Sequence, residues 1–224
     1  MNQDTQYIFV HGLSGWGSYD ERYEKMPYWG MHGGDLMQYL KAQGYACHAA
    51  SVAPTGSAWD RACELYAQLA GKRVDYGEAH SREYRHERFG RDFSGQPLIE
   101  GWGPETRLVL LGHSFGGATV RLFAELMANG DPEEQSAGTS DISELFMGGL
   151  ADRILSIVTI AARPTGPRHM TCLQTRRFIL KTFACHGGAG SWPSRCPRKQ
   201  SRRWMGVMRG IMPDTTCTST GLLL

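Results

Sequence analysis

The sequence contains no apolar run close to the ~20 residues that a membrane-spanning helix needs, and its mean hydropathy is −0.38. We expect no signal peptide, because Met1 stands only a few polar residues before an apolar segment of strand length. None of the six cysteines belongs to a C-x2-C or C-x4-C pair, which argues against a metal site built from cysteines. These absences favour a soluble chain, and its 224 residues suffice for one sizeable core, or for one domain with an appendage.

Acidic residues are nearly absent from the end of the chain. Residues 1–162 hold 13 Lys+Arg and 21 Asp+Glu, a net charge of −8, whereas residues 163–224 hold 11 Lys+Arg and only Asp214, a net charge of +10. Four of the six cysteines and half of the prolines also lie in the second segment, where only 178–183 could form a short strand or a helical turn. We therefore predict a folded part over 1–162 and a basic, Cys-rich tail without recognisable fold over 163–224.

Short apolar segments alternate with segments of helical period before Ala162. We predict strands over 7–10, 45–52, 108–111 and 154–160, and helices over 35–43, 57–71 and from about 116 to 129. Residues 72–103 are polar, aromatic and charged without a clear period, so we interpret them as an inserted surface region, and 141–146 as a short helix or lid segment. Strands that alternate with helices predict a mostly parallel sheet, whose chemistry lies at the carboxyl ends of the strands.

The predicted strand 108–111 runs directly into Gly112-His113-Ser114-Phe115-Gly116, and a helical segment follows. Strand, G-x-S-x-G and helix in this order are typical of the nucleophile elbow of an α/β-hydrolase. The two glycines leave room for a turn so tight that the serine hydroxyl is exposed above the sheet. The pattern therefore predicts Ser114 as a nucleophile, although G-x-S-x-G without these flanks would be an ordinary turn.

A second loop of this kind follows the first predicted strand, where the sequence reads His11-Gly12-Leu13-Ser14-Gly15. A Gly-rich loop after an early strand is where an α/β-hydrolase places one half of its oxyanion hole. Because the triad order puts the general base after the nucleophile, we interpret His11 and His113 as neighbours that shape these turns.

The chain resembles the zinc-containing thermophilic Bacillus-type bacterial lipases, which are related to the staphylococcal lipases. The resemblance covers about residues 7–162 and is most specific in its middle blocks, for which no general hydrolase rule asks. The blocks are H-G-L-S-G-W-G at His11, Y-W-G at Tyr28, W-D-R-A-C-E-L-Y-A-Q-L at Trp59, V-D-Y-G-E-A-H at Val74, R-H-E-R-F-G-R at Arg85, G-H-S-F-G-G at Gly112 and S-I-V-T-I-A-A at Ser156.

This resemblance implies an α/β-hydrolase fold with a mostly parallel central sheet, incomplete at its C-terminal side. It implies a secreted triacylglycerol lipase that hydrolyses carboxylic esters at a lipid–water interface. Ser114 would form the acyl-enzyme, and the backbone amides of Leu13 and Phe115 would hold the oxyanion. The sequence says nothing of acyl-chain preference or oligomeric state.

The resemblance also implies a zinc site, because Asp60, His80 and His86 match three of the family's four ligands. Imidazole and carboxylate groups suit Zn²⁺, and four ligands close a tetrahedral structural site. The fourth family ligand, an Asp downstream of the elbow, is not found in this chain, and the family's calcium site has no visible counterpart. We expect the zinc to clamp the 72–103 insertion, with Trp59 packed against it or simply part of the core.

No triad acid or base can be assigned. The histidines after the elbow are His169 and His186, and Asp214 follows both, which breaks the order of acid before histidine. The acids in between all precede the last recognisable strand; they include Asp131, Glu133, Glu134, Asp141, Glu144 and Asp152. We hypothesise that a frameshift near Ala162 replaced the family's C-terminal part, which resequencing the locus would test.

Two alternatives to an active lipase remain. The basic tail, with Trp192 and Trp204, could bind nucleic acid or anionic lipid by counterion release, although we expect no nucleic-acid partner. The chain could also be a non-catalytic remnant, because Ser114 has no assignable partners.

Overall fold

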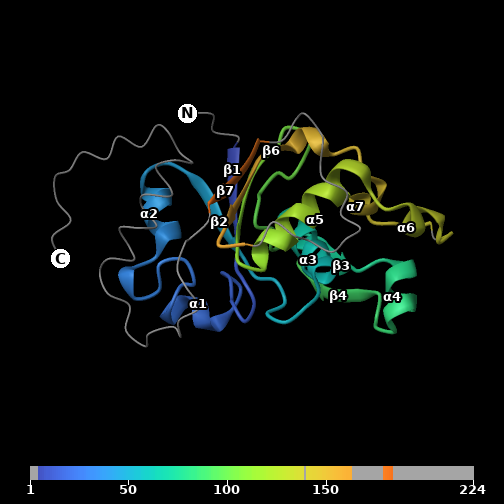
Figure 1. Cartoon of the computed structure of the whole chain (residues 1–224), viewed down its shortest axis with the longest axis horizontal. Helices are drawn as coiled ribbons and strands as arrows, with labels where there is room; N and C mark the ends of the chain where they lie inside the picture. The colour runs from blue at the N-terminus through green and yellow to red at the C-terminus, as the bar shows by residue number, and fades with distance from the viewer. Residues whose placement is uncertain (1–4, 139, 163–178, 184–224) are drawn as a thin grey trace.

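The computed structural model describes residues 5–138, 140–162 and 179–183. Its main sheet has five parallel strands in the order β2-β1-β5-β6-β7 (Figure 1). The strands are β1 (Thr5–Val10), β2 (Ala46–Ala50), β5 (Arg107–His113), β6 (Ile154–Ile160) and β7 (Ile179–Phe183). The parallel sheet is confirmed, and of the two alternatives for 178–183 the strand is the one observed.

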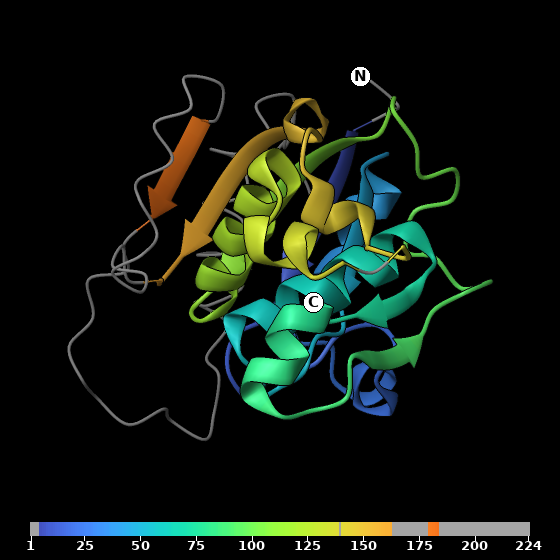
Figure 2. The ribbon, with the colours of Figure 1, turned by 90° about the vertical axis from the view of Figure 1, so that its right-hand side faces the viewer.

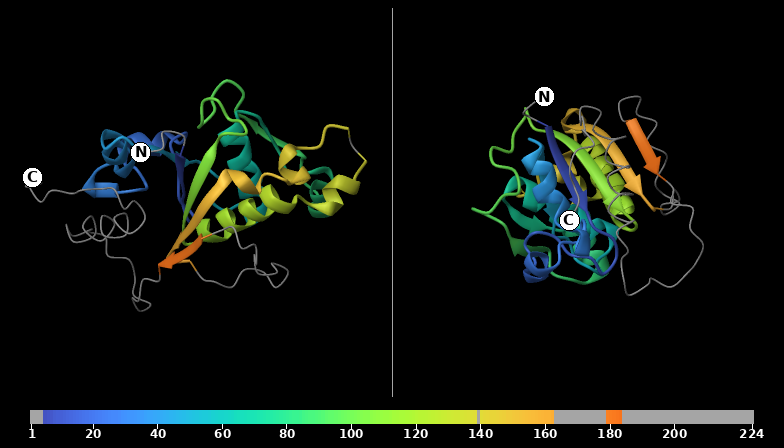
Figure 3. Two further views of the ribbon diagram at one scale, coloured as in Figure 1. Left: turned by 90° about the horizontal axis from the view of Figure 1, so that it is seen from above. Right: turned by 90° about the vertical axis from the view of Figure 1, so that its left-hand side faces the viewer.

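Helices cover both faces of this sheet. α2 (Leu36–Ala42) lies on one face, and α3 (Ala58–Ala70) and α5 (Gly116–Asn129) lie on the other, as the views in Figures 2 and 3 show. Alternate strand residues serve the two faces, so Ile8 and Leu110 pack under α3 and α5, whereas Phe9 and Leu111 pack towards α2. Both groups are fully buried, which explains why the strands have continuous apolar runs.

The predicted helices begin and end at their capping residues. Ser57 and Asp60 form a reciprocal capping box at the start of α3, and Gly71 ends the helix in the left-handed conformation at φ 62°. Asp35 caps α2 by accepting a hydrogen bond from the N–H of Met37. Local capping chemistry thus fixes the position of α3, which carries one of the predicted metal ligands.

The 72–103 segment contains more regular structure than its sequence indicated. Strands β3 (Arg73–Asp75) and β4 (Phe89–Asp92) form a small antiparallel sheet, and α4 (Glu78–Tyr84) lies between them in sequence. Arg88 ties this unit to the rest of the chain, since its guanidinium pairs with Asp75 at 2.9 Å and with Asp141 at 3.1 Å. Because polar pairs of this kind hold the unit in place, its sequence has no apolar period that would predict these strands and this helix.

The remaining elements are short connections. They are α1 (Glu21–Lys25), η1 (Met31–Gly33), α6 (Pro132–Ser136), α7 (Glu144–Met147) and η2 (Ala151–Arg153). α7 is the short helix that was one interpretation of 141–146, and α6 begins at Pro132 with Asp131 as its N-cap. Among the described residues, no helix is both long and apolar enough to span a membrane.

Candidate active site and metal site

The register of the sheet brings the two predicted catalytic loops together. Val10 at the end of β1 pairs with Gly112 near the end of β5, so the segments that follow these strands leave the sheet side by side. A Cβ atom placed on Gly12 would lie 3.0 Å from the Cβ of Ser114. A side chain at position 12 would therefore push Ser114 by a few tenths of an ångström, and glycine avoids this tight contact.

Ser114 has the geometry of a nucleophile elbow. Its side chain is exposed, and its backbone has a φ of 52°, a left-handed conformation that costs a non-glycine residue about 1 kcal/mol. Its N–H donates to the carbonyl of Ile160 at 2.8 Å, which holds the turn against β6. A Cβ on Gly116 would collide with the carbonyl oxygens of Val10 and His11, so this glycine lets the turn lie directly on β1.

Two backbone N–H groups next to Ser114 are left without an acceptor. In the loop after β1, the N–H groups of Gly12, Ser14 and Gly15 all donate hydrogen bonds, whereas Leu13 makes none within the described part of the chain. The N–H of Phe115 makes none there either. These two donors are the ones that the sequence assigned to the oxyanion.

A hydrogen-bonded chain joins the two loops through Tyr28. The N–H of Gly12 donates to the hydroxyl oxygen of Tyr28 at 3.1 Å, and this hydroxyl lies 2.6 Å from Nδ1 of His113. Burial lowers the pKa of His113 and raises that of the Tyr28 hydroxyl, so the tyrosine donates to a neutral imidazole. His113 thus supports the elbow, as its sequence position suggested.

His11 lies below the same loop and is fully buried. Its Nδ1 is 2.8 Å from the carbonyl oxygen of Gly12, which can only accept, so Nδ1 carries the proton. Nε2 accepts from the N–H of Val52 at 3.4 Å. Burial lowers the pKa of His11 to about 4, which keeps the imidazole neutral at pH 7.

Arg61, on α3, is also fully buried beside this loop. Its guanidinium donates to the carbonyl oxygens of His11, Gly12 and Ala53, and to the hydroxyl of Thr119. Within the described residues it forms no ion pair with a carboxylate. Burial lowers its pKa to about 10, so it stays charged at neutral pH.

Four of the acids that follow Ser114 have other partners. Asp131 and Glu134 cap helices, and Asp141 and Glu144 form ion pairs with basic residues of the insertion. The histidines that could serve as the base lie outside the described residues, as does Asp214. The described residues therefore assign neither the triad acid nor the base.

The predicted metal ligands converge between the start of α3 and the insertion. One ligand atom each from Asp60, His80 and His86 lies within 4.8 Å of the others. Nε2 of His80 is 3.3 Å from Oδ1 of Asp60, and this hydrogen bond lowers the pKa of the Asp60 carboxyl. Nδ1 of His86 donates to the carbonyl of Glu87 at 2.9 Å, which leaves the lone pair of Nε2 available.

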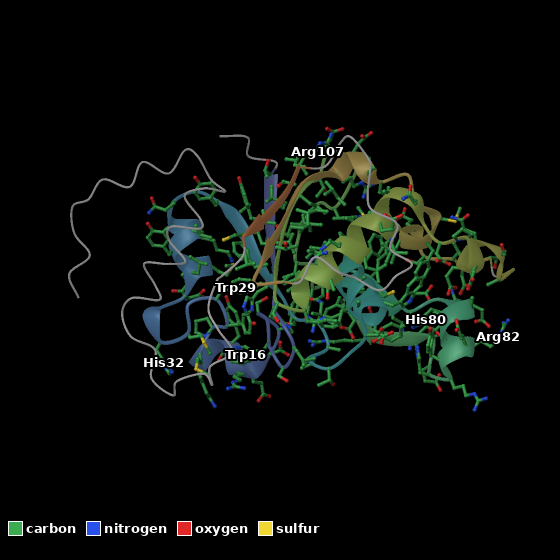
Figure 4. The ribbon with its side chains drawn as sticks, in the orientation of Figure 1. Trp16, Trp29, His32, His80, Arg82 and Arg107 are labelled. Carbon is green, nitrogen blue, oxygen red and sulfur yellow. The ribbon has the colours of Figure 1, made fainter. Side chains whose placement is uncertain are left out.

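Aromatic rings hold His80 in place. The indole of Trp59 stacks on the His80 ring with centroids 4.9 Å apart and on Phe146 at 5.5 Å. Figure 4 places His80 on the side of the sheet opposite to Trp29, which packs in the core towards α2. The candidate metal site is thus formed by α3, α4 and the segment that follows α4, and Trp59 both packs against the core and supports a candidate ligand.

The donor set fits a divalent metal such as zinc. Two imidazole nitrogens and a carboxylate oxygen are common zinc ligands, and a tetrahedral site separates neighbouring ligand atoms by about 3.3 Å. The 4.8 Å limit observed here needs only small side-chain movements to reach that spacing. Three ligands lie together, and the described residues add no fourth to this group.

A parallel sheet with helices on both faces, and a strained serine between a strand and a helix, define an α/β-hydrolase. Residues 2–184 match the family described as "Lipase-like, C-terminal domain", and the chain belongs to this family. The match includes β7, which lies beyond the proposed division at Ala162; that division stays a prediction.

Known proteins confirm the resemblance to the staphylococcal lipases. The chain is 41% identical over 162 residues to Lipase 2 of Staphylococcus aureus, an alignment that covers 71% of this chain and 23% of that protein. The structure of EstA from Clostridium botulinum matches with a TM-score of 0.65 and 40% identity, over 71% of this chain and 36% of that one. Staphylococcus hyicus lipase matches with a TM-score of 0.64 and 38% identity, over 72% and 41%. The chain thus spans about a quarter of the Staphylococcus aureus relative's length.

Three residues of these sites were not singled out from the sequence. Arg61 and Tyr28 hold the loop at Gly12, and Glu134 caps the helix that carries His80. A signal existed only for Arg61, which stands four residues before the buried Leu65 and therefore on the inner side of α3.

Proposed function

We propose that this chain is the nucleophile-bearing part of a serine ester hydrolase of the lipase type. The proposal rests above all on an exposed Ser114 in a strained elbow, near the N–H groups of Leu13 and Phe115, which have no acceptor in the described part of the chain. Membership of a lipase-like family supports the same reaction.

In this reaction the Ser114 oxygen attacks the ester carbonyl carbon, and the carbonyl oxygen gains negative charge. The N–H groups of Leu13 and Phe115 stabilise that charge. Collapse of the intermediate releases the alcohol and leaves an acyl-enzyme, which water cleaves to release the carboxylic acid. We assign no residue as base, because His169 and His186 lie outside the described residues.

The proposed substrates are lipid esters, in particular long-chain acylglycerols at a lipid–water interface, and the proposed location is extracellular. Both follow from the likeness to proteins named lipase. Asp60, His80 and His86 would hold a zinc ion that cross-links α3 to the insertion, which is a structural and not a catalytic role.

A fluorophosphonate probe tests the proposal directly, since it phosphonylates an activated serine. The full chain is incubated with the probe, and the modified residue is identified by mass spectrometry. We expect labelling at Ser114 that disappears in Ser114→Ala and persists in Ser94→Ala, which removes an exposed serine of the insertion. Absence of labelling in the unmodified chain would reject catalysis and favour a non-catalytic remnant.

A further inference from the structure

The carbonyl oxygen of Gly12 and the N–H of Leu13 belong to the same peptide group. Because a peptide is planar and trans, the direction of the carbonyl fixes the direction of the N–H on its opposite side. Any group that holds the Gly12 carbonyl therefore also aims the Leu13 N–H, the donor that the proposed function assigns to the oxyanion.

This carbonyl is held by three donors. Nδ1 of His11 lies at 2.8 Å, the N–H of Gly15 at 3.2 Å and Nη1 of Arg61 at 3.4 Å. His11 and Gly15 belong to the loop itself and move with it. Among the residues that the structure describes, only Arg61 reaches this carbonyl from another element, α3.

The guanidinium also contacts the opposite side of the site. Its Nε donates to the hydroxyl of Thr119 in the first turns of α5 at 3.0 Å, and its carbon lies 5.1 Å from the ring centroid of Phe115. Arg61 thus connects the loop that ends in Leu13 with the helix that begins after Phe115. A planar group with five donors can hold several acceptors in fixed directions, which an ammonium cannot do as well.

Burying a charge costs free energy unless hydrogen bonds or an opposite charge offset it. Among the described residues no carboxylate lies within ion-pair distance of Arg61, and Glu64 attracts the guanidinium only from farther away. Here the compensation comes from carbonyl and hydroxyl oxygens.

We infer that Arg61 is a positioning residue for the oxyanion hole: it orients the Gly12–Leu13 peptide from α3 and links it to α5. The inference rests on the proposed function, because it assigns to Arg61 a task in the reaction of Ser114. Arg61 does not touch the substrate, and its effect passes through the Leu13 N–H.

The test measures fluorophosphonate labelling of the full chain as a function of probe concentration. This separates the maximal labelling rate at Ser114 from the probe concentration that gives half of it. We expect Arg61→Met to lower the maximal rate about 10- to 100-fold, below the full loss of an oxyanion donor, with little change in the half-saturating concentration. Arg61→Lys should retain an intermediate rate.

Arg88→Met is the matched control, because Arg88 is a largely buried arginine whose partners, Asp75 and Asp141, lie outside the loop. It should label at the rate of the unmodified chain. Hydrogen exchange gives a second readout that needs no reactivity: amides of residues 11–16 should exchange faster in Arg61→Met, whereas those of β5 should not change.

Unchanged exchange over 11–16, or an unchanged maximal rate, would overturn the inference. Faster exchange throughout the sheet would also overturn it, since it would show a general loss of structure. If the unmodified chain is not labelled, the proposed function is wrong, and so is the role of Arg61 in the reaction. The exchange experiment still decides whether Arg61 holds the loop, because it does not depend on reactivity.

Discussion

The carboxylate of Glu134 accepts a hydrogen bond from the backbone N–H of His80 at 2.7 Å. Its second oxygen accepts from the N–H of Ala79 at 3.0 Å, and the side chain is almost completely buried. Glu134 therefore closes the N-terminus of α4 from a separate helix, α6, where the helix dipole favours a negative group. It fixes the backbone of one of the three candidate metal ligands.

We predict that Glu134→Gln weakens zinc binding by about 10- to 100-fold, as for other groups that orient a ligand. The amide keeps one acceptor oxygen but places an NH₂ group against a backbone N–H. Isothermal titration with zinc measures the affinity. Glu133→Gln is the matched control, since Glu133 is exposed on the same helix; equal losses in both variants would refute the role of Glu134.

Capping and periodicity made most of the fold predictable. The strand predicted over 154–160 has the bounds of β6, and the helix predicted over 57–71 is α3 between its caps Ser57 and Gly71. These elements are specified by neighbouring residues and by burial of a regular apolar pattern. The elbow was equally accessible, because the conformation of Ser114 follows from a local turn between two glycines.

The polar supports could not be predicted in the same way. The cap from Glu134 joins residues more than fifty positions apart. The pairing of Arg88 with Asp141 holds the insertion without any apolar period. Arg61 carries a charge that ordinarily stays at the surface. Such contacts depend on the completed tertiary structure, so the sequence presented Arg61 and Arg88 only within resembling blocks, and Glu134 and Asp141 only among the acids after the elbow.

Removal of one metal ligand tests the site as a whole. We expect zinc to raise the thermal unfolding temperature of the unmodified chain, because a ligand that binds only the folded state stabilises it, and EDTA to reverse the shift. His86→Ala should abolish most of this shift by leaving two ligands. His32→Ala removes an exposed histidine elsewhere and should keep it. An equal shift in both variants would place the zinc at another site.

The Tyr28 hydroxyl offers a test of the link between the two loops. Tyr28→Phe leaves the N–H of Gly12 and Nδ1 of His113 without their shared partner, which should reduce the free energy of unfolding by about 1–3 kcal/mol. We also expect slower labelling of Ser114. Urea unfolding and probe kinetics measure the two effects. Tyr39→Phe removes a hydroxyl outside this network and should change neither quantity. If Tyr28→Phe leaves the free energy of unfolding and the labelling rate unchanged, the bridge does not stabilise the two loops.

The buried imidazole of His11 makes stability depend on pH. Its folded pKa of about 4 lies below the value of 6.5 for an exposed histidine, so between these values the unfolded chain binds more protons than the folded one. The contribution of His11 is therefore complete above pH 6.5 and is lost as the pH falls towards 4. The shift corresponds to about 3 kcal/mol in total.

We predict that His11→Asn removes this part of the pH dependence. The asparagine NH₂ can replace the Nδ1 donor to the Gly12 carbonyl, but it does not titrate in this range. Urea unfolding between pH 4 and 7.5 measures the free energy for both proteins. Other buried histidines, such as His48, contribute equally to both, so the difference between the two curves isolates His11. Parallel curves would mean that His11 is already neutral in the unfolded chain or that its charge is accommodated in the fold.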